Sequence, residues 1–385
     1  MRMLKKVQLC VRDWKERYKI SRYKAFEIKK AKDPRRVKLS ESVVLSPTQK
    51  KEIDDFFVEN YGRKVQYYWH RNYTAHSGSF DKEYFPEYLY IPEFERYMNW
   101  HCEYATVYAD KNVLPHLAKS IGVKTPEVVL SIVEKAFIDP MNNGLTREEA
   151  LESIRNCGEV FIKPTVNSSS GRGCFIANIV DGTDTITGNS TEQILAQVGD
   201  NCVMQKVVKN HASIAKIYAG SVNTFRVITY RWKDKFLHMP VIMRIGRNGS
   251  YLDNAHAGGM FIAVDDDGTL HEEAMTEFNQ KFKIHPNTQI VFSEQKIDLL
   301  PAVIEAAKKM HLATPQLGVV NWDFTIDAEG NPVLIEGNTK GGSIWLIQMA
   351  HGKSGFEDKT AEVLQWLKKM RRIKAADWHK HTFGN

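Results

Sequence analysis

The sequence lacks the features that mark membrane-spanning and secreted proteins. No apolar run reaches the ~18 residues that a bilayer-spanning helix needs, and residues 1–19 contain no apolar signal-peptide core. No internal repeat and no low-complexity tract is present. These absences argue against a transmembrane protein and a repeat protein, and we expect a cytoplasmic chain.

Cysteine is also scarce, with five in 385 residues. The five are scattered and form no CxxC pair: Cys10, Cys102, Cys157, Cys174 and Cys202. A disulfide framework or a zinc module needs cysteines in paired spacings. We therefore expect reduced thiols and neither of those two kinds of site.

Positive charge is concentrated at the two ends of the chain, whereas the body of the chain is acidic. The formal net charge is +7, yet residues 1–40 carry a net +11 and residues 366–385 a net +5. Residues 41–365 therefore carry −9. An acidic body argues against a specific nucleic-acid partner. A nucleic-acid-binding module built on the basic ends is the alternative.

Residues 1–40 are predicted to form a basic helix with one apolar stripe. The stripe recurs at spacings of three and four, between faces rich in Lys and Arg: Leu4, Val7, Val11, Trp14 and Tyr18. One interpretation packs this helix on the body, with the basic face in water. The other lays it on an anionic membrane or an acidic polymer, which would make the protein membrane-peripheral.

The rest of the chain favours the α+β (mixed α/β) class. Residues 41–105 are rich in aromatic side chains, which fill a core or line a substrate pocket. From about residue 106, predicted helices alternate with short strands. A last helix is predicted over residues 357–374.

A loop rich in Ser and Gly lies between two apolar strands in residues 161–176. Small residues let backbone N–H groups converge on an anion, and Lys163 and Arg172 add positive charge. The loop is no Walker A loop, because its lysine precedes it, and no Rossmann fingerprint, because a strand follows it. It predicts a phosphate-binding loop, with a surface hairpin tip as the alternative.

Residues 321–338 predict a β-hairpin with one polar face. A turn that pairs Asp327 with Pro332 sets Asp323 opposite Glu336. Side chains in such positions lie about 5 Å apart at Cβ, so the two carboxylates would repel each other. A neutralising group is therefore expected on this face.

A divalent cation is the group that this hairpin predicts. Mg²⁺ prefers carboxylate oxygens together with substrate phosphates and water, and Asn338 adds an amide beside Glu336. The alternatives are a solvated face with counter-ions and a register slip by one residue, which would separate the carboxylates.

Arg226 and Arg244 each lie within an apolar strand pattern. An arginine in such a place needs a carboxylate, a phosphate or an aromatic face, so an ion pair and a phosphate contact are both open.

Two loops of small and polar residues, 253–259 and 339–342, suit the rim of a ligand site. His256 in the first loop has either a structural or a chemical role.

The order of these pieces resembles the ATP-grasp superfamily. The segments that carry the resemblance are Asp110-Lys111, Gly122–Pro126, Phe161–Pro164, Asn223–Arg226 and Ile335–Asn338. More narrowly, Asn-Thr-Phe-Arg at 223–226 and Trp322-Asp323 with Ile335-Glu336-Gly337-Asn338 resemble the sugar-transfer-associated ATP-grasp group. The resemblance covers roughly residues 100–350. It implies an ATP-grasp fold with an N-terminal basic helical extension.

The resemblance implies a role for each matching residue. The phosphate and nucleotide contacts would be Lys111, Lys163, Ser168, Ser169, Ser170, Gly171, Arg172, Gly173, Gln205, Lys206, Val207 and Arg226. Lys163, Arg226 and Arg244 would be catalytic, through charge neutralisation. Asp323, Glu336 and Asn338 would hold two Mg²⁺. The substrate contacts would be Asn254, His256, Gly258, Gly259 and Lys340.

It also implies a domain plan and an activity. The plan is a basic helical and aromatic-rich region (1–100), an N-lobe with a glycine-rich lid (101–210), a C-lobe with the metal site (211–356), and a C-terminal helix with a basic tail (357–385). The expected activity is an ATP-dependent carboxylate–amine ligase in polysaccharide or cell-surface glycan modification, acting on a small-molecule or glycan carboxylate and an amine. An ATP-grasp kinase that phosphorylates a hydroxyl and a non-catalytic ATP-binding regulator are the alternatives.

Overall fold

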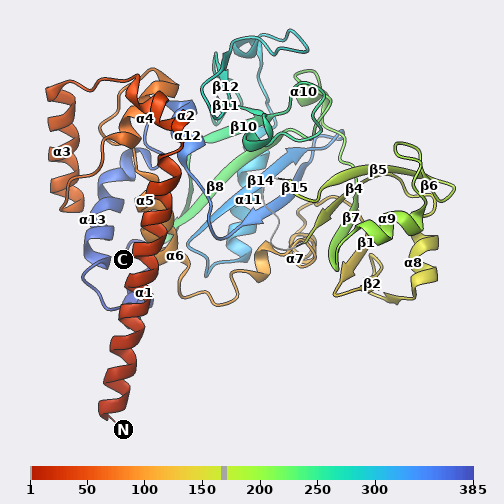
Figure 1. Cartoon of the computed structure of the whole chain (residues 1–385), viewed down its shortest axis with the longest axis horizontal. Coiled ribbons are helices and arrows are strands. Elements are labelled where there is room, and N and C mark those ends of the chain that lie inside the picture. Colours follow the sequence, from red (N-terminus) through yellow and green to blue (C-terminus); the bar gives the residue numbers. More distant parts are fainter. Residues whose placement is uncertain (1, 166–170) are drawn as a thin grey trace.

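The computed structural model describes residues 2–165 and 171–385, and the side chains from residue 7 onward. Figure 1 shows three parts in a row, with helices from both ends of the chain at one side. An eight-stranded sheet lies in the middle, and a seven-stranded sheet lies at the far side.

The seven-stranded sheet is antiparallel throughout, in the order β3-β2-β1-β7-β4-β5-β6. Its strands are β1 (Val128–Val133), β2 (Ala136–Ile138), β3 (Gly144–Leu145), β4 (Gly158–Pro164), β5 (Phe175–Val180), β6 (Thr183–Asp184) and β7 (Asn201–Lys206). Two helices cover it, α8 (Arg147–Ile154) and α9 (Thr191–Gln197). Each begins with a capping box, at Thr146 and at Ser190.

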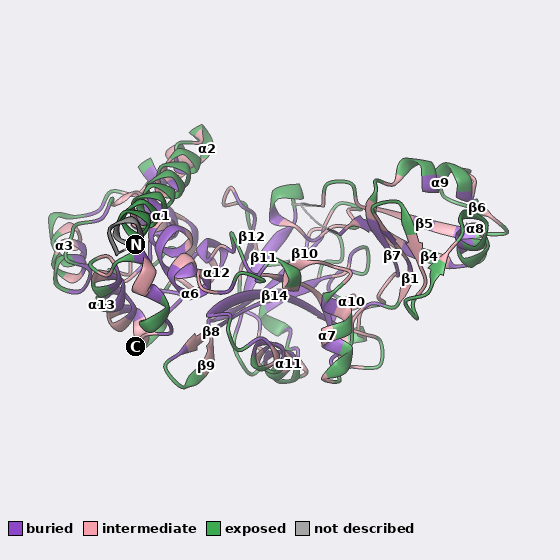
Figure 2. Ribbon diagram, turned by 90° about the horizontal axis from the view of Figure 1, so that it is seen from below, coloured by how far each residue is buried: buried purple, intermediate pink, exposed green. Residues whose placement is uncertain are grey.

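The eight-stranded sheet has the order β13-β12-β11-β10-β8-β14-β15, with β9 paired to β8. Its strands are β8 (Thr224–Trp232), β9 (Lys235–His238), β10 (Val241–Ile245), β11 (Met260–Val264), β12 (Ala274–Met275), β13 (Lys281–Phe282), β14 (Val319–Ile326) and β15 (Pro332–Asn338). Every residue of β14 is buried, because layers of side chains cover both faces of this sheet. Figure 2 shows β8 and β14 as a buried layer.

One face of this central sheet packs against helices from both chain ends. These helices are α1 (Arg2–Ala31), α2 (Pro34–Glu41), α3 (Pro47–Tyr61), α4 (Tyr68–Ser77), α5 (Glu87–Leu89), α6 (Arg96–Asn99), α12 (Trp345–His351) and α13 (Thr360–Met370), with the π-helical turn η1 (Tyr90–Glu95) and the 3₁₀ turns η5 (Glu357–Lys359) and η6 (Ala375–Lys380). The aromatic residues between 67 and 100 lie mainly here, in the core.

The other face packs against α11 (Leu300–Ala313) and α7 (Leu114–Ser120). The remaining short elements are α10 (Ala212–Ala215), η2 (Val107–Ala109), η3 (Ala255–Ala257) and η4 (Phe292–Glu294). No helix in the described residues is long and apolar enough to cross a membrane.

The basic N-terminal region is two helices and not one. Asp33 accepts a hydrogen bond from the backbone N–H of Arg35 and caps α2, and Pro34 opens that helix. A proline ring cannot continue α1, so the single predicted helix over 1–40 breaks at this point. The predicted helix over 357–374 is also too long, because Glu357 has a positive φ of 49° and α13 starts after it.

The apolar stripe of α1 does not pack on the body. Val7, Val11, Trp14 and Tyr18 are all exposed, while the side chain of Leu4 lies outside the described side chains. The helix is held by its opposite face, where Glu16 and the core residues Ile20 and Ala31 are buried. The helix thus packs on the body, as one interpretation expects, but through the face opposite to the predicted stripe.

The β14–β15 hairpin has the predicted face but a different turn. Ile326 pairs with Pro332, so the predicted pairing of Asp327 with Pro332 is wrong. A β-bulge between Asp323 and Phe324 then shifts the register by one residue. Without the bulge, Glu336 would lie opposite Trp322 and point to the apolar face. With it, Asp323 faces Glu336.

Candidate functional site

The first part of the site lies where the two sheets meet. Lys163 is on β4 of the seven-stranded sheet, and Glu336 is on β15 of the central sheet. Lys111, in the segment before α7, lies with its Nζ 3.4 Å from Glu336 Oε2, and its backbone N–H donates to the carbonyl of Thr165. Asn338 donates to Glu336 Oε1 at 3.1 Å. Three chain segments thus converge on one carboxylate.

The protonation states of this cluster follow from its charges. Burial and the nearby charge of Lys111 together lower the pKa of Lys163 to about 8, although the charge of Glu336 opposes this. Burial by itself would raise the pKa of Glu336, but the charge of Lys111, the amide of Asn338 and the charge of Lys163 lower it to about 2. Glu336 is therefore a carboxylate at neutral pH, beside two amines.

The second part of the site is an arginine pair around Asp323. Arg226 lies directly opposite Asp323 on the neighbouring strand and donates from Nε and Nη2 to its two oxygens, both at 2.8 Å. Arg244 Nη2 lies 3.1 Å from Asp323 Oδ2. Asp323 is fully buried, and this bidentate contact is the strong form of an ion pair. The expected repulsion between Asp323 and Glu336 is thus relieved by cationic side chains.

A second buried carboxylate, Asp253, holds Arg244 from the other side. Its Oδ2 lies 3.5 Å from Arg244 Nε and accepts from the hydroxyl of Thr224 at 2.5 Å. The same hydroxyl accepts from Arg244 Nε and Nη2. Burial raises the pKa of Asp253, although Arg244 and Thr224 oppose this. The network fixes the direction of the Arg244 guanidinium.

The donor set fits Mg²⁺ at Glu336 better than at Asp323. Glu336 is half-buried, and its oxygens have spare lone pairs beside the Asn338 amide oxygen. The oxygens of Asp323 already accept from Arg226 and Arg244, so a cation there would share them. The ligand set Asp323, Glu336 and Asn338 stays a prediction, with Glu336 as its accessible carboxylate.

The glycine loop is described only at its end, and Ser168, Ser169 and Ser170 lie outside the described residues. Gly171 and Gly173 both have positive φ, 75° and 72°, which glycine adopts without strain. A side chain at Gly171 would meet Leu252, and the Tyr251 hydroxyl donates to the Cys174 carbonyl at 3.1 Å. The end of the glycine loop therefore contacts the segment between β10 and β11, which belongs to the central part of the molecule. The side chain of Arg172 is exposed.

The expected nucleotide-base contacts lie at the end of β7. Gln205 is buried beside a small pocket lined by Lys111, Leu114, Pro115, Thr125, Pro126, Leu334 and Ile335. The N–H of Lys206 donates to the Glu127 carbonyl, and that of Val207 to the Glu159 carbonyl. The backbone N–H groups of Lys206 and Val207 therefore already have hydrogen-bond acceptors. The pocket beside Gln205 is lined by residues from both sheets. The base contact stays a prediction.

The expected substrate residues lie on a rim next to these charges. His256, in η3, is exposed, and its Nδ1 lies 2.6 Å from Glu277. The buried Glu277 also pairs with Arg36 of α2 at 2.6 Å. The His256 ring stacks on Trp345, and the Arg36 guanidinium lies 4.3 Å from the centre of that indole. The N-terminal region thus contributes to this rim.

The other predicted rim residues surround this group. Asn254 caps η3 by accepting from the N–H of His256, and its carbonyl accepts from Gly259. Gly258 has a φ of 94° and is exposed, and Lys340 is exposed on the loop after β15. The side chain of Glu95 accepts from the N–H groups of Gly341 and Gly342, which fixes this second loop.

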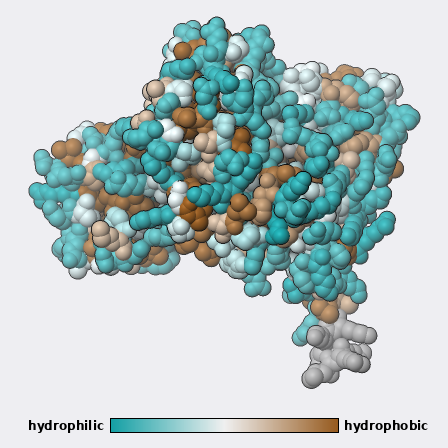
Figure 3. All heavy atoms as spheres, turned by 180° about the vertical axis from the view of Figure 1, so that it is seen from behind, coloured by the Kyte–Doolittle hydropathy of each residue, from teal (hydrophilic) through white to brown (hydrophobic). Residues whose placement is uncertain are grey.

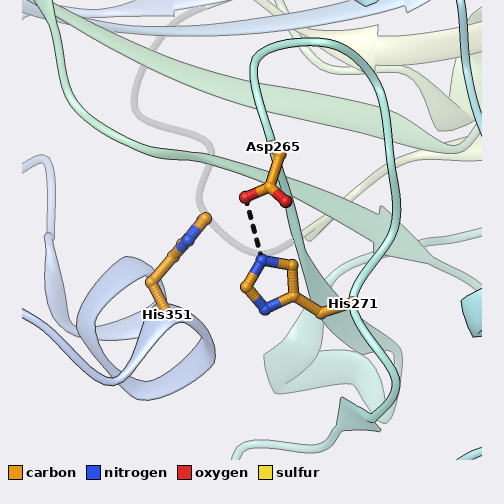
Figure 4. A group of neighbouring side chains, drawn as sticks. All are labelled: Asp265, His271 and His351. Atoms are coloured by element: carbon orange, nitrogen blue, oxygen red, sulfur yellow. Dashed lines mark hydrogen bonds and ion pairs between the residues drawn. The ribbon is translucent and has the colours of Figure 1, made fainter.

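Three possible metal ligands gather elsewhere, at the end of α12 (Figure 4). His271 Nε2 lies 3.0 Å from Asp265, and its ring packs edge-on against His351. His351 makes a separate hydrogen bond, from its Nε2 to the Val241 carbonyl at 2.7 Å. Asp265 is exposed, and its Oδ1 is already hydrogen-bonded to His271 Nε2.

Sequence reasoning missed the residues that orient the functional ones. Asp253 directly precedes the predicted substrate residue Asn254, and this position next to a predicted residue is the signal that could have identified it. Arg36 was hidden among many basic residues, and Glu277 lies in no motif. The contact between Arg36 and Glu277 spans 241 residues, and no local pattern encodes it.

A family model described as sugar-transfer associated ATP-grasp matches residues 91–363. This range includes Lys111, Lys163, Arg226, Asp323 and Glu336. A search of curated proteins gave no match.

Solved structures resemble the chain at low identity. An ADP complex of N5-carboxyaminoimidazole ribonucleotide synthetase is 13% identical with a TM-score of 0.37, covering 62% of this chain and 46% of that one. An L-amino acid ligase from Bacillus licheniformis is 13% identical with a TM-score of 0.39, covering 69% and 48%. D-alanine–D-alanine ligase from Bacillus anthracis is 16% identical with a TM-score of 0.38, covering 69% of each chain. The chain spans about half the length of the first two.

Proposed function

Because the chain belongs to the sugar-transfer associated ATP-grasp family, we propose that it is an ATP-dependent ligase that joins a carboxylate to an amine. The observation that carries the proposal is one continuous network of charged side chains between the two sheets. It runs from Lys163 and Lys111 through Glu336 to Arg244 and Asp323. Such a network neutralises and positions phosphate groups and needs no separate acid–base pair.

In the first half of the reaction, a substrate carboxylate oxygen attacks the γ-phosphorus of ATP and ADP leaves. Lys163 and the glycine loop hold the phosphates, and Arg226 and Arg244 offset the negative charge on the transferred group. Mg²⁺, when bound by Glu336 and Asn338 with Asp323 beside them, supplies further charge neutralisation at the phosphates. The product of this half is an acyl phosphate.

In the second half, an amine attacks the carbonyl carbon of the acyl phosphate. The carbon–nitrogen bond forms, phosphate leaves and the amine loses a proton. The rim of Asn254, His256, Gly258, Gly259 and Lys340 is the substrate end in this proposal. Glu277 holds the His256 ring in one orientation, and Arg36 holds Glu277. Acceptors with sugar and uronic-acid character fit the family description.

The test is isotopic and starts from a screen. Amino acids and uronic-acid sugars are crossed against amines, and ADP release identifies the active pair. With ¹⁸O in the acceptor carboxylate, we expect one labelled oxygen in the released phosphate, because the acyl phosphate carries it away. Turnover to an amide with unlabelled phosphate would exclude the acyl-phosphate step.

A matched pair of variants ties this activity to the site. Lys163→Met should abolish ADP release, whereas Lys209→Met, which removes an exposed lysine paired with Glu159 of the same strand β4, should leave it unchanged. A phosphorylated hydroxyl product without amide formation would instead assign the kinase activity. Retained cellular function in both Lys163→Ala and Glu336→Ala would favour a non-catalytic ATP-binding regulator.

A further inference from the structure

The outer face of α1 is an apolar stripe that nothing in the described structure covers. Val7, Val11, Trp14 and Tyr18 are 54%, 45%, 64% and 52% exposed. Their spacing of four, three and four places them on one side of the helix. Trp14 and Tyr18 stack on each other, with ring centres 5.6 Å apart. The stripe is therefore an ordered, contiguous surface and not a set of isolated residues.

The same helix is anchored to the body by its other face. The carboxylate of Asp13 accepts from the backbone N–H of Ala375, and Arg17 donates to the carbonyls of Arg371 and Ile373. Glu16 pairs with Arg96. These contacts fix the stripe in an outward direction, and the end of α1 projects from the body (Figure 1). Figure 3 shows hydrophobic and hydrophilic residues side by side just above that end.

Positive charge flanks the stripe from two parts of the sequence. Lys15 is exposed beside the stripe, and Arg22 and Lys29 are exposed farther along its line; among the described residues no ion pair involves them. The contacts of Asp13 and Arg17 bring the C-terminal segment alongside α1, with Arg372 and Lys374 exposed. Basic residues of the N-terminal helix and of the C-terminal segment thus lie near the stripe.

We propose that this surface docks the protein on an anionic lipid bilayer. Aromatic and aliphatic side chains on one helix face, flanked by lysine and arginine, are the composition of helices that lie in the membrane interface. The stripe would enter the boundary between headgroups and acyl chains, and the basic flank would contact anionic headgroups.

A second copy of the chain fits this surface less well. A symmetric dimer would bring the same strongly basic flanks together, and like charges across an interface are unfavourable. A nucleic acid would pair with the charge but leave the apolar stripe without a partner. The seven-stranded sheet lies at the opposite side of the molecule from α1, so a docked protein keeps the site open (Figure 1).

The experiment is vesicle flotation of the full-length protein. Phosphatidylcholine vesicles containing phosphatidylglycerol are compared with phosphatidylcholine alone, at low and high salt. We expect binding to the anionic vesicles only, weakened by salt. Val11→Ser with Trp14→Ser should reduce binding at least about tenfold, because apolar burial drives insertion. Tyr23→Ser, an exposed aromatic of the same helix outside the stripe, is the matched control and should bind as the wild type does.

Circular dichroism and thermal melting verify that each variant is folded. Absence of binding to anionic vesicles, or equal binding by the stripe variant and the wild type, would overturn the proposal. A dimer in solution that the stripe variant converts to a monomer would assign the surface to a second copy. Binding that the stripe variant retains but Lys15→Gln with Arg22→Gln abolishes would mean charge attraction without insertion, which also contradicts the proposal.

Discussion

Glu95 shows how one buried side chain fixes a substrate-side loop. It is the last residue of the π-helical turn η1, and its two oxygens accept from Gly341 and Gly342 at 2.8 and 2.9 Å. A side chain at Gly342 would collide with Asn321, so this loop lies directly on the hairpin that carries Glu336. A change in the charge of Glu95 therefore acts on the site through the backbone that follows it.

We predict that Glu95 makes stability fall as pH rises from about 4.5 to about 8. Burial raises its pKa to about 8 in the folded protein, against 4.5 ordinarily, so the folded state keeps a proton that the unfolded chain has lost. One such group changes the free energy of unfolding by at most about 1.4 kcal/mol per pH unit. Urea unfolding between these pH values should show a shallower decline for Glu95→Gln.

The matched control for that prediction is Glu103→Gln, because Glu103 is exposed. Its pH dependence should follow that of the wild type. Equal pH slopes for Glu95→Gln and the wild type would show that Glu95 does not hold the proton in the folded state.

The β14–β15 hairpin is the element on which the site depends most. Asp323 lies between Arg226 on β8 and Glu336 on β15, so three adjacent strands bring charges of both signs together. The one-residue bulge lets Ile326 pair with Pro332 at the turn while Asp323 still lies opposite Glu336. Gly337 also allows β15 to pack this closely on β14, because a Cβ at this position would lie 2.7 Å from the ring of Trp322.

We predict that Gly337→Ala displaces β15 and weakens Mg²⁺-dependent nucleotide binding. Overpacking against the fully buried Trp322 should cost on the order of 1–3 kcal/mol in unfolding free energy. Isothermal titration with Mg·ATP measures the binding. Gly144→Ala is the control, since a Cβ there meets nothing within 4 Å. Unchanged binding in Gly337→Ala would show that β15 has room to adjust.

At the scale of the whole molecule, the N-terminal region divides into two functional parts. Residues from Asp13 onward are tied to the body by hydrogen bonds and ion pairs, including Lys24 with Glu93 and Arg36 with Glu277. The start of α1 projects beyond it (Figure 1), and Arg12 is the first of the described residues with a side-chain contact to the body, over the ring of Trp100. An interpretation of residues 1–40 as one surface-docking segment outside the fold is therefore too simple.

We predict opposite results for two truncations. Removal of residues 2–11 should leave the melting temperature and nucleotide binding nearly unchanged. Removal of residues 2–41 should destabilise strongly, because the buried carboxylates Glu93 and Glu277 lose Lys24 and Arg36, and breaking a buried ion pair costs on the order of 3–5 kcal/mol. Differential scanning calorimetry compares the two. Equal melting temperatures would contradict the packing role of α1 and α2.

Linear patterns were sufficient to predict the family, the hairpin with Asp323 opposite Glu336, and the apolar stripe of α1. The hairpin and the stripe follow from short-range patterns such as strand alternation, turn residues and helical spacing. The family follows from the order of motifs along the chain, which also predicts that Lys163 and Arg226 belong to one site.

The folded structure was needed to show which groups neutralise these carboxylates and where the basic ends lie. Arg226 reaches Asp323 across 97 residues, and Arg36 reaches Glu277 across 241. Pairings at such separations depend on which strands and helices become neighbours, and a linear pattern carries no information on that. The same packing set the stripe outward, because the opposite face of α1 holds the buried side chains and ion pairs.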